Sequence, residues 1–303
     1  MKKFYYVLAF ILFGAVLWYL FIKPHDYQVN FKVKTFPGTI NQIIKTWSNT
    51  IDNSELLEQQ NISLLALKQQ LKFGDSTYIY TWKIIPETDS TSKVKVYVKD
   101  TEHSFANKLM VPFSDTDFEK RTRKTLLDFN TKLSEHISKF KVKIIGEEQI
   151  NPTFCACITQ TTTQFGKAQG MMKDFPLLDG ILAKNGVKLN GRPFLKVTNW
   201  DLAKENLTFD FCYPIIKSEI LPQHPEIIYK QLPSLTAIKA EYYGNYITSD
   251  RAWYALIDYA KKNDIALTGL PIEVFHNNPN MGGDELQWKT EIYMPLKTVG
   301  SEQ

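Results

Sequence analysis

The sequence is poor in the residues from which metal centres and disulfide frameworks are built. It contains 3 cysteines and 5 histidines in 303 residues, and the histidines occur singly, without the spacing of a zinc site. It also lacks a glycine-rich phosphate loop, a Gly-x-Ser-x-Gly elbow and a His-Glu-x-x-His motif. We therefore expect neither a metal nor a cofactor.

Neither sign of charge is in large excess. The 36 Lys and Arg residues against 32 Asp and Glu residues give a net charge of +4. A dedicated nucleic-acid-binding protein usually concentrates basic residues on one face, so we do not expect nucleic acid as a partner. The hydrophobic content of 44% is enough for a folded core, and the length suggests about two domains. A globular binding protein, a metal-free enzyme and a structural protein remain as classes.

One apolar run, residues 4–22, contains no charged residue. At about 1.5 Å per residue, a helix of this length crosses the roughly 30 Å hydrocarbon core of a bilayer. The run is longer than the apolar region of a signal peptide, and no small-residue cleavage site follows it. We predict an uncleaved transmembrane anchor in residues 1–25, with a signal peptide as the alternative. Lys2 and Lys3 predict a cytoplasmic N-terminus and extracytoplasmic soluble domains, although lysines soon after the run weaken this bias.

Residues 26–141 have the pattern of a first soluble domain. Alternating apolar residues predict strands at 27–34, 78–85 and 93–98, with a short helix after Pro37. A long final helix is expected to carry one apolar stripe of Phe118, Leu126, Phe129, Leu133, Ile137 and Phe140. This order, in layout and not in motif, resembles the START-like (SRPBCC, polyketide-cyclase-like) family. The resemblance implies a helix-grip fold, in which the final helix lies across a curved sheet and roofs an apolar cavity.

Residues 142–303 contain an internal repeat at a constant offset of 78 residues. Each copy predicts the order strand, helix, strand, strand, and two such units can bury faces that one unit alone would expose. Ligand sites often lie in a groove between such halves. The matched pairs include Phe175 with Trp253, Lys184-Asn185 with Lys262-Asn263, Gly191-x-Pro193 with Gly269-x-Pro271 and, after a three-residue loop difference, Asp210 with Glu291.

The second copy carries the more distinctive motifs. It contains Glu241-Tyr-Tyr-Gly-Asn-Tyr246, Gly269-Leu-Pro271 and Trp288-Lys-Thr-Glu-Ile-Tyr-Met-Pro295. With these motifs the C-terminal half resembles the GyrI-like (gyrase-inhibitor-like) small-molecule-binding domain, which is also the effector-binding domain of many multidrug-sensing bacterial regulators. No DNA-binding helix-turn-helix precedes it, so the regulator role is not carried over. The predicted fold class is α+β: a transmembrane helix, a START-like domain and a duplicated GyrI-like domain.

The resemblance implies that Glu291 lies in the groove, as the counter-charge of a lipophilic cation. A cation over an aromatic ring gains about 0.5–2 kcal/mol, so nearby aromatic residues are candidate walls. From the residues alone, a solvated glutamate is the alternative, because acidic side chains are mostly exposed. Trp253 and Trp288 are more typical of core than of wall, and Asp210 is the counterpart of Glu291 in the first copy. The remaining candidate ligand-binding residues are Tyr293, Tyr243, Tyr246 and Phe275.

The cysteines are predicted to be small buried hydrophobic residues. Cys155 and Cys157 lie two apart on one expected strand, where they are poorly placed to bridge each other. A bond from Cys212 to either of them would need adjacent strands.

These patterns favour a membrane-anchored protein that binds a lipophilic small molecule, cationic or aromatic, between the two repeats. The first alternative is a hydrolase acting on an electrophilic small molecule, with Glu291 as general base and Tyr293 as hydrogen-bond donor. The second is an envelope protein with closed grooves, whose partner is another protein of unknown identity.

Overall fold

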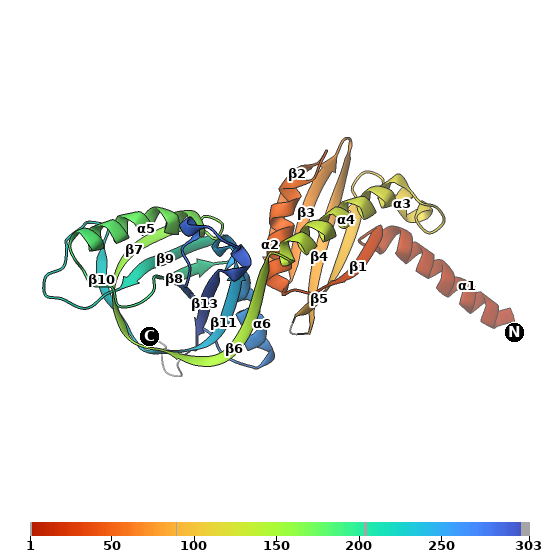
Figure 1. Cartoon of the computed structure of the whole chain (residues 1–303). Helices are drawn as coiled ribbons and strands as arrows, with labels where there is room; N and C mark the ends of the chain where they lie inside the picture. The colour runs from red at the N-terminus through yellow and green to blue at the C-terminus, as the bar shows by residue number, and fades with distance from the viewer. Residues whose placement is uncertain (1, 89, 203–204, 298–303) are drawn as a thin grey trace. The chain divides into compact units, whose positions relative to one another are not determined.

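The computed structural model describes residues 2–88, 90–202 and 205–297 (Figure 1). The chain divides into two compact units, Met1–Glu135 and His136–Gln303. Each unit contains one antiparallel sheet, so the mixed α+β fold class is confirmed.

The chain begins with an apolar helix, α1 (Lys2–Leu17), which continues as a wider turn, η1 (Trp18–Ile22). Residues Lys3–Ile22 are long and apolar enough to cross a membrane, and none of the span is buried against the rest of the chain. The helix is therefore a candidate for a single membrane span or for a signal sequence.

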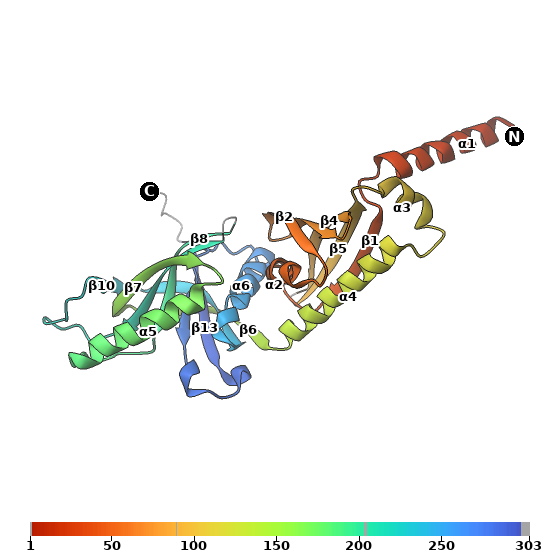
Figure 2. The same ribbon diagram turned by 90° about the horizontal axis from the view of Figure 1, so that it is seen from above.

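The N-terminal unit is built on a five-stranded sheet of order β1-β5-β4-β3-β2. Side chains along β5 are alternately buried and half-buried, because successive residues of a strand point to opposite faces. Figures 1 and 2 show α4 lying across this sheet. The elements are β1 (Tyr27–Val33), α2 (Pro37–Trp47), η2 (Ser48–Thr50), β2 (Glu55–Ser63), β3 (Ala66–Phe73), β4 (Ser76–Thr88), β5 (Thr91–Asp100), α3 (Ser104–Met110) and α4 (Asp117–Ile137).

An aromatic core joins the helices of this unit to the sheet. The ring of Phe129 on α4 lies 5.0 Å from Trp47 on α2 and 4.9 Å from Trp82 on β4. Most of the predicted apolar stripe is buried on α4, but Ile137 is half-buried. The helix ends at Ile137, and Phe140 begins the next strand. The sequence pattern also missed β2 as a strand, because this edge strand is polar and shows no alternation of buried residues. The START-like assignment stays a prediction.

The C-terminal unit contains an eight-stranded antiparallel sheet of order β10-β7-β9-β8-β12-β13-β11-β6. Its elements are β6 (Phe140–Ile150), β7 (Thr153–Thr163), α5 (Lys167–Lys184), β8 (Phe194–Asp201), β9 (Asn206–Pro214), β10 (Ile228–Leu232), β11 (Leu235–Gly244), η3 (Tyr246–Thr248), α6 (Arg251–Lys262), β12 (Ile272–Phe275), η4 (Pro279–Met281), η5 (Glu285–Gln287) and β13 (Lys289–Pro295).

The predicted duplication is visible in this sheet. The first copy is β7-α5-β8-β9 and the second is β11-α6-β12-β13, so each has the order strand, helix, strand, strand. The copies meet where β8 pairs with β12 at the centre of the sheet. Even single bridges recur at equivalent places, between Leu189 and Ile215 in one copy and between Leu267 and Leu296 in the other.

The two faces of this sheet differ in what covers them. Residues of α5 and α6 pack with one set of strand residues into the main core, which includes Leu178, Trp253 and Ile292. The opposite face carries a smaller apolar cluster around Cys157 and Ile272. Neighbouring residues of one strand therefore belong to different environments, which decides where each candidate site residue lies.

Candidate functional site

A cavity of about 350 Å³ opens on the helix-bearing face of the eight-stranded sheet, between the two copies. The first copy contributes Met171 and Phe175 of α5 and Tyr213 of β9, and the second contributes Tyr246 of η3 and Phe275 of β12. Ring centroids are 6.2 Å apart for Phe175 and Tyr213 and 5.0 Å apart for Tyr246 and Phe275. The cavity is thus an aromatic and thioether-lined space suited to an apolar ligand.

Local sequence explains this wall. Met171, Phe175, Leu178 and Leu182 recur at helical spacing along α5, so one side of the helix faces the sheet. At the edge of the cavity, Gly191 has a φ of 148°, and a Cβ there would lie 3.2 Å from the ring of Pro214. Glycine alone adopts this conformation readily, so the repeated Gly-x-Pro motif shapes the cavity in the first copy.

The polar residues that line the cavity are basic, amide-bearing or hydroxyl-bearing. Arg192, His276 and Asn277 contribute to its lining, and among the described residues that line it none carries a carboxylate. The hydroxyl of Tyr246 donates to the backbone carbonyl oxygens of Asn277 and Lys289, and it accepts from the backbone N–H of Asn277. Its ring is therefore held in place by backbone contacts. Burial lowers the pKa of His276, partly offset by Glu291.

Of the residues singled out from the sequence, two come together in this cavity: Tyr246 and Phe275. Trp288 lies behind them, with its ring 5.8 Å from that of Tyr246. Trp253 is fully buried in the core, as its place on an amphipathic helix favoured.

Glu291 and Tyr293 share one face of β13, as strand alternation predicted, and it is the face opposite the cavity. The Glu291 carboxylate lies 3.2 Å from the Lys239 ammonium, 3.1 Å from that of Lys289 and 3.3 Å from His276 Nε2. The Tyr293 hydroxyl also donates to it. A cation arriving at Glu291 would compete with basic groups already paired with it.

The remaining candidates have similar partners. The Tyr243 hydroxyl donates to Glu241, which pairs with Lys289 at 2.7 Å. Asp210, the counterpart of Glu291 in the first copy, is buried, pairs with Lys230 at 2.5 Å and accepts a hydrogen bond from Thr159. None of these acids lines the cavity.

The electrostatics of Glu291 weigh against the catalytic alternative. Burial raises the pKa of Glu291, but hydrogen bonds and charges from Lys289, Lys239 and His276 outweigh burial and hold the pKa at about 2. A carboxylate of so low a pKa is a weak proton acceptor at neutral pH, where a general base works best with a pKa near the operating pH. The hydrolase alternative is not supported.

Replacing Glu291→Gln is expected to lower the free energy of unfolding at pH 7 by about 1–2 kcal/mol, between the effects of exposed and buried pairs. The folded pKa is depressed, so this stabilisation is present above the unfolded value near 4.5 and is lost as the pH falls towards 2. Urea denaturation at pH 7, 4 and 2.5 should therefore show the two proteins converging in acid. Glu147→Gln, at an exposed strand position, is the control; a constant gap at all three pH values would contradict the prediction.

Sequence reasoning missed a buried ion pair that joins the two copies. The Lys167 ammonium, on the first turn of α5, lies 2.7 and 2.9 Å from the two oxygens of Glu273 on β12. Ser249 and the Trp253 indole also donate to this carboxylate. Lys167 lies one helical turn before Met171, so the pair fixes the helix that forms one wall of the cavity. No signal in the sequence connects two residues 106 positions apart.

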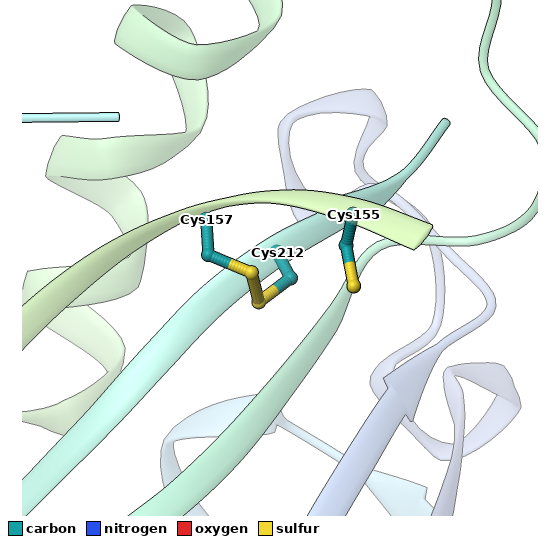
Figure 3. Close-up of side chains that lie close together, drawn as sticks. All are labelled: Cys155, Cys157 and Cys212. Carbon is teal, nitrogen blue, oxygen red and sulfur yellow. A yellow bond between two sulfur atoms is a disulfide. The ribbon is translucent and has the colours of Figure 1, made fainter. Parts of the chain in front are cut away.

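All three cysteines are buried in an apolar cluster, as predicted, but two of them are not free thiols. Cys157 on β7 and Cys212 on β9 are directly opposite in register and form a disulfide, while Cys155 is a buried free thiol (Figure 3). The three sulfur atoms lie within 4.8 Å of one another, but in this oxidised state only Cys155 has a thiol to offer a metal. The adjacent strands required for the bond are supplied by the sheet order.

Comparison with known proteins agrees with the motifs. The sequence model of the GyrI-like small-molecule-binding domain matches residues 156–297. No curated protein matches the chain.

Similar solved structures include the C-terminal domain of EcmrR, with 20% identity, a TM-score of 0.45, and 53% of this chain and 99% of that chain covered. SAV2435 bound to tetraphenylphosphonium has 16% identity, a TM-score of 0.36 and coverage of 52% and 95%. A hydrolase encoded by lin2189 from Listeria innocua has 9% identity, a TM-score of 0.31 and coverage of 56% and 98%. At these values the structural likenesses carry no argument about function, and the family model is the finding that assigns the domain. Residues 156–297 form a GyrI-like small-molecule-binding domain.

Proposed function

We propose that this protein is a receptor for an apolar, aromatic small molecule, which binds in the cavity between the two copies of the GyrI-like domain. The observation that carries the proposal is the cavity itself. Its volume of about 350 Å³ falls within the range of small-molecule sites, and its walls are methionine and aromatic side chains. Methionine at such a surface adapts to ligands of different shape.

The charge of the lining favours a neutral or anionic ligand over a cationic one. Arg192 supplies a cation to the lining, whereas Glu291 and Asp210 lie on the other face and are paired with lysines. A buried cation without a counter-charge is costly. The cation preference expected for Glu291 would therefore require a site on the opposite face, with that carboxylate released from its present partners.

A binding titration on the full-length protein in lipid nanodiscs tests this proposal, with empty nanodiscs as reference. Anilinonaphthalene sulfonate serves as the anionic aromatic probe and rhodamine 6G as the cationic one. We expect Met172→Asp, which places a charge on the cavity wall without disturbing a buried position, to weaken binding of the anionic probe about tenfold or more, or roughly 1.4 kcal/mol. Arg192→Gln should weaken the same probe through loss of charge.

Two matched variants act as controls. Ile220→Asp introduces the same charge at a strongly exposed residue outside the cavity and should leave the affinity unchanged. Glu291→Gln removes the acid on the opposite face, which pairs with the lining residue His276, and should change the affinity far less than Met172→Asp does. Preferential binding of rhodamine 6G that depends on Glu291 and ignores Met172→Asp would refute the proposed cavity and place the ligand at the Glu291 cluster.

We also propose that the Lys3–Ile22 helix anchors the chain in a membrane with both units outside the cytoplasm. Lys2 and Lys3 at the N-terminal end of the span favour a cytoplasmic N-terminus. The Cys157–Cys212 disulfide adds support, since disulfides persist mainly in oxidising compartments.

The near-neutral charge balance supports a role without nucleic acid.

A further inference from the structure

The short helix α3 has the reverse of the polarity expected for a helix on a water-exposed surface. Its buried residues are Asn107 and Lys108, whereas Phe105, Leu109 and Met110 are each more than half exposed. Phe113, just after the helix, is 86% exposed. A contiguous group of large exposed apolar side chains marks an interaction site, while single ones do not.

The polar residues of α3 fix which way its apolar side faces. The Asn107 amide donates to Asp100 at the end of β5, and Asp100 also accepts from the backbone amides of Glu102 and His103. The Ser104 hydroxyl donates to Asp26, the residue just before β1. With its polar side tied to the sheet, α3 holds its apolar side outward.

The same helix is joined to the end of the apolar N-terminal helix. The Lys108 ammonium donates to the carbonyl oxygens of Leu20 and Lys23, groups at the C-terminal end of a helix that have no later amide to bond. The ring of Phe105 lies 5.6 Å from that of Phe21. Figures 1 and 2 both show α3 beside the end of this helix, where the chain turns into β1.

This contact identifies what covers the apolar side. Phe21 is the penultimate residue of the Lys3–Ile22 span, so it lies at the boundary between hydrocarbon and headgroups when the span is in a bilayer. A side chain that touches Phe21 lies at the same depth. The apolar side of α3 therefore continues the lipid-facing surface of the span. The hydrogen bonds from Lys108 to the carbonyl oxygens at the helix end are consistent with a position at the membrane boundary, because lipid offers these carbonyls few other partners.

We propose that residues 104–113 form an interfacial segment, with Phe105, Leu109, Met110 and Phe113 inserted at the headgroup–acyl boundary of the bilayer. The proposal rests on the membrane anchoring proposed above. Such a segment gives the N-terminal unit a second attachment to the membrane, beside the span itself. The unit is then held against the bilayer and does not swing on a single tether.

The depth of single labelled positions in the full-length protein tests this directly. Phe113→Cys is labelled with the environment-sensitive fluorophore NBD in vesicles of phosphatidylcholine and phosphatidylglycerol, and quenching by a nitroxide-labelled lipid is measured. Ile11→Cys reports on the span, and Leu127→Cys reports on an exposed residue of α4. The unmodified chain is the labelling blank, because Cys155 is buried and the other two cysteines are bonded.

We expect a blue shift, a severalfold rise in emission and strong quenching at positions 11 and 113, and none of these at 127. Quenching at 11 with position 113 behaving like 127 would overturn the interfacial segment and leave the anchor standing. Absence of quenching at 11 would overturn both.

A second variant separates insertion by the apolar side from mere nearness to the anchor. Leu109→Asp and Met110→Asp together, in the chain labelled at 113, add two charges to positions that are already exposed. Loss of most of the quenching supports insertion. Unchanged quenching would show that the tether alone holds the segment near lipid, and would overturn the role given to the apolar side.

Discussion

Lys167→Met is expected to lower the free energy of unfolding of the C-terminal unit by about 3–5 kcal/mol, the usual cost of breaking a buried ion pair from one side. The ammonium and both Glu273 oxygens are shielded from water. Without Lys167 the carboxylate keeps the hydrogen bonds from Ser249 and Trp253 but has lost the cation at 2.7 Å. The loss is therefore mainly the penalty of leaving a charge buried and unpaired.

A double-mutant cycle isolates this penalty. Lys167→Met combined with Glu273→Gln removes both charges and leaves an amide oxygen that can still accept from Trp253, so we expect the double variant to recover at least about 2 kcal/mol of the loss. Urea denaturation followed by tryptophan fluorescence is a suitable measurement, since the Trp253 ring lies 4.7 Å below the Lys167 ammonium. Lys184→Met, at an exposed position near the end of α5, should change stability by less than about 0.5 kcal/mol. A Lys167 variant as mild as this control would contradict the assignment.

The pair also breaks the symmetry of the duplicated domain. At the offset of 78 residues, Glu273 corresponds to Leu195 and Lys167 corresponds to Asn245. The strand position equivalent to Glu273 in the first copy is therefore a buried apolar residue, and the ion pair has no counterpart there. This ion pair forms only when α5 of the first copy lies over β12 of the second. It therefore favours this packing of the two copies over the one in which their roles are exchanged. In some proteins, buried charges contribute this kind of specificity more than stability.

Local patterns in the sequence were sufficient to predict the order of elements within each copy, but not β6 and β10, the two strands of the sheet that lie outside the copies. Repeated Gly-x-Pro turns, a helix N-terminal to each turn and alternation in the strands do not depend on long-range contacts, and the order of elements in both copies is confirmed. Alternation also placed Glu291 and Tyr293 together on one face of β13. Which of the two faces bears the cavity depends on how α5 packs, and strand periodicity carries no information about that.

For the same reason, only some of the residues that line the cavity could be predicted from the sequence. Tyr246 and Phe275 come from the more distinctive second copy, whereas Met171 and Tyr213 come from the first, where ordinary core residues occupy the helix and strand. Phe175 was identified in the sequence only as the counterpart of Trp253 in the repeat. A cavity between two copies needs both sets of residues, and their meeting is a property of the packed sheet.

The disulfide also depends on how the strands are ordered in the folded sheet, which local sequence patterns do not show. Removing it by Cys157→Ala and Cys212→Ala is expected to lower the free energy of unfolding by about 2–4 kcal/mol, because a cross-link over a sequence separation of 55 residues restricts the unfolded chain. Denaturation with and without reductant should give the same difference in the unmodified protein. Cys155→Ala keeps the disulfide, so it should preserve the full sensitivity to reductant; a Cys157 and Cys212 variant as stable as this control would contradict the prediction.

Counting thiols in intact cells connects this bond to the compartment of the chain. All three cysteines are buried, so cells are quenched with acid, the protein is denatured without reductant, and free thiols are tagged with a maleimide polymer that shifts the gel mobility. Extracytoplasmic units should show one tag per chain from Cys155, and three after prior reduction, since the cytosol keeps thiols reduced and the outer compartments do not. Three tags without reduction would contradict the proposed topology, because the chain would then have folded where the Cys157–Cys212 bond does not form, and its C-terminal unit would lack the stabilisation that the bond provides.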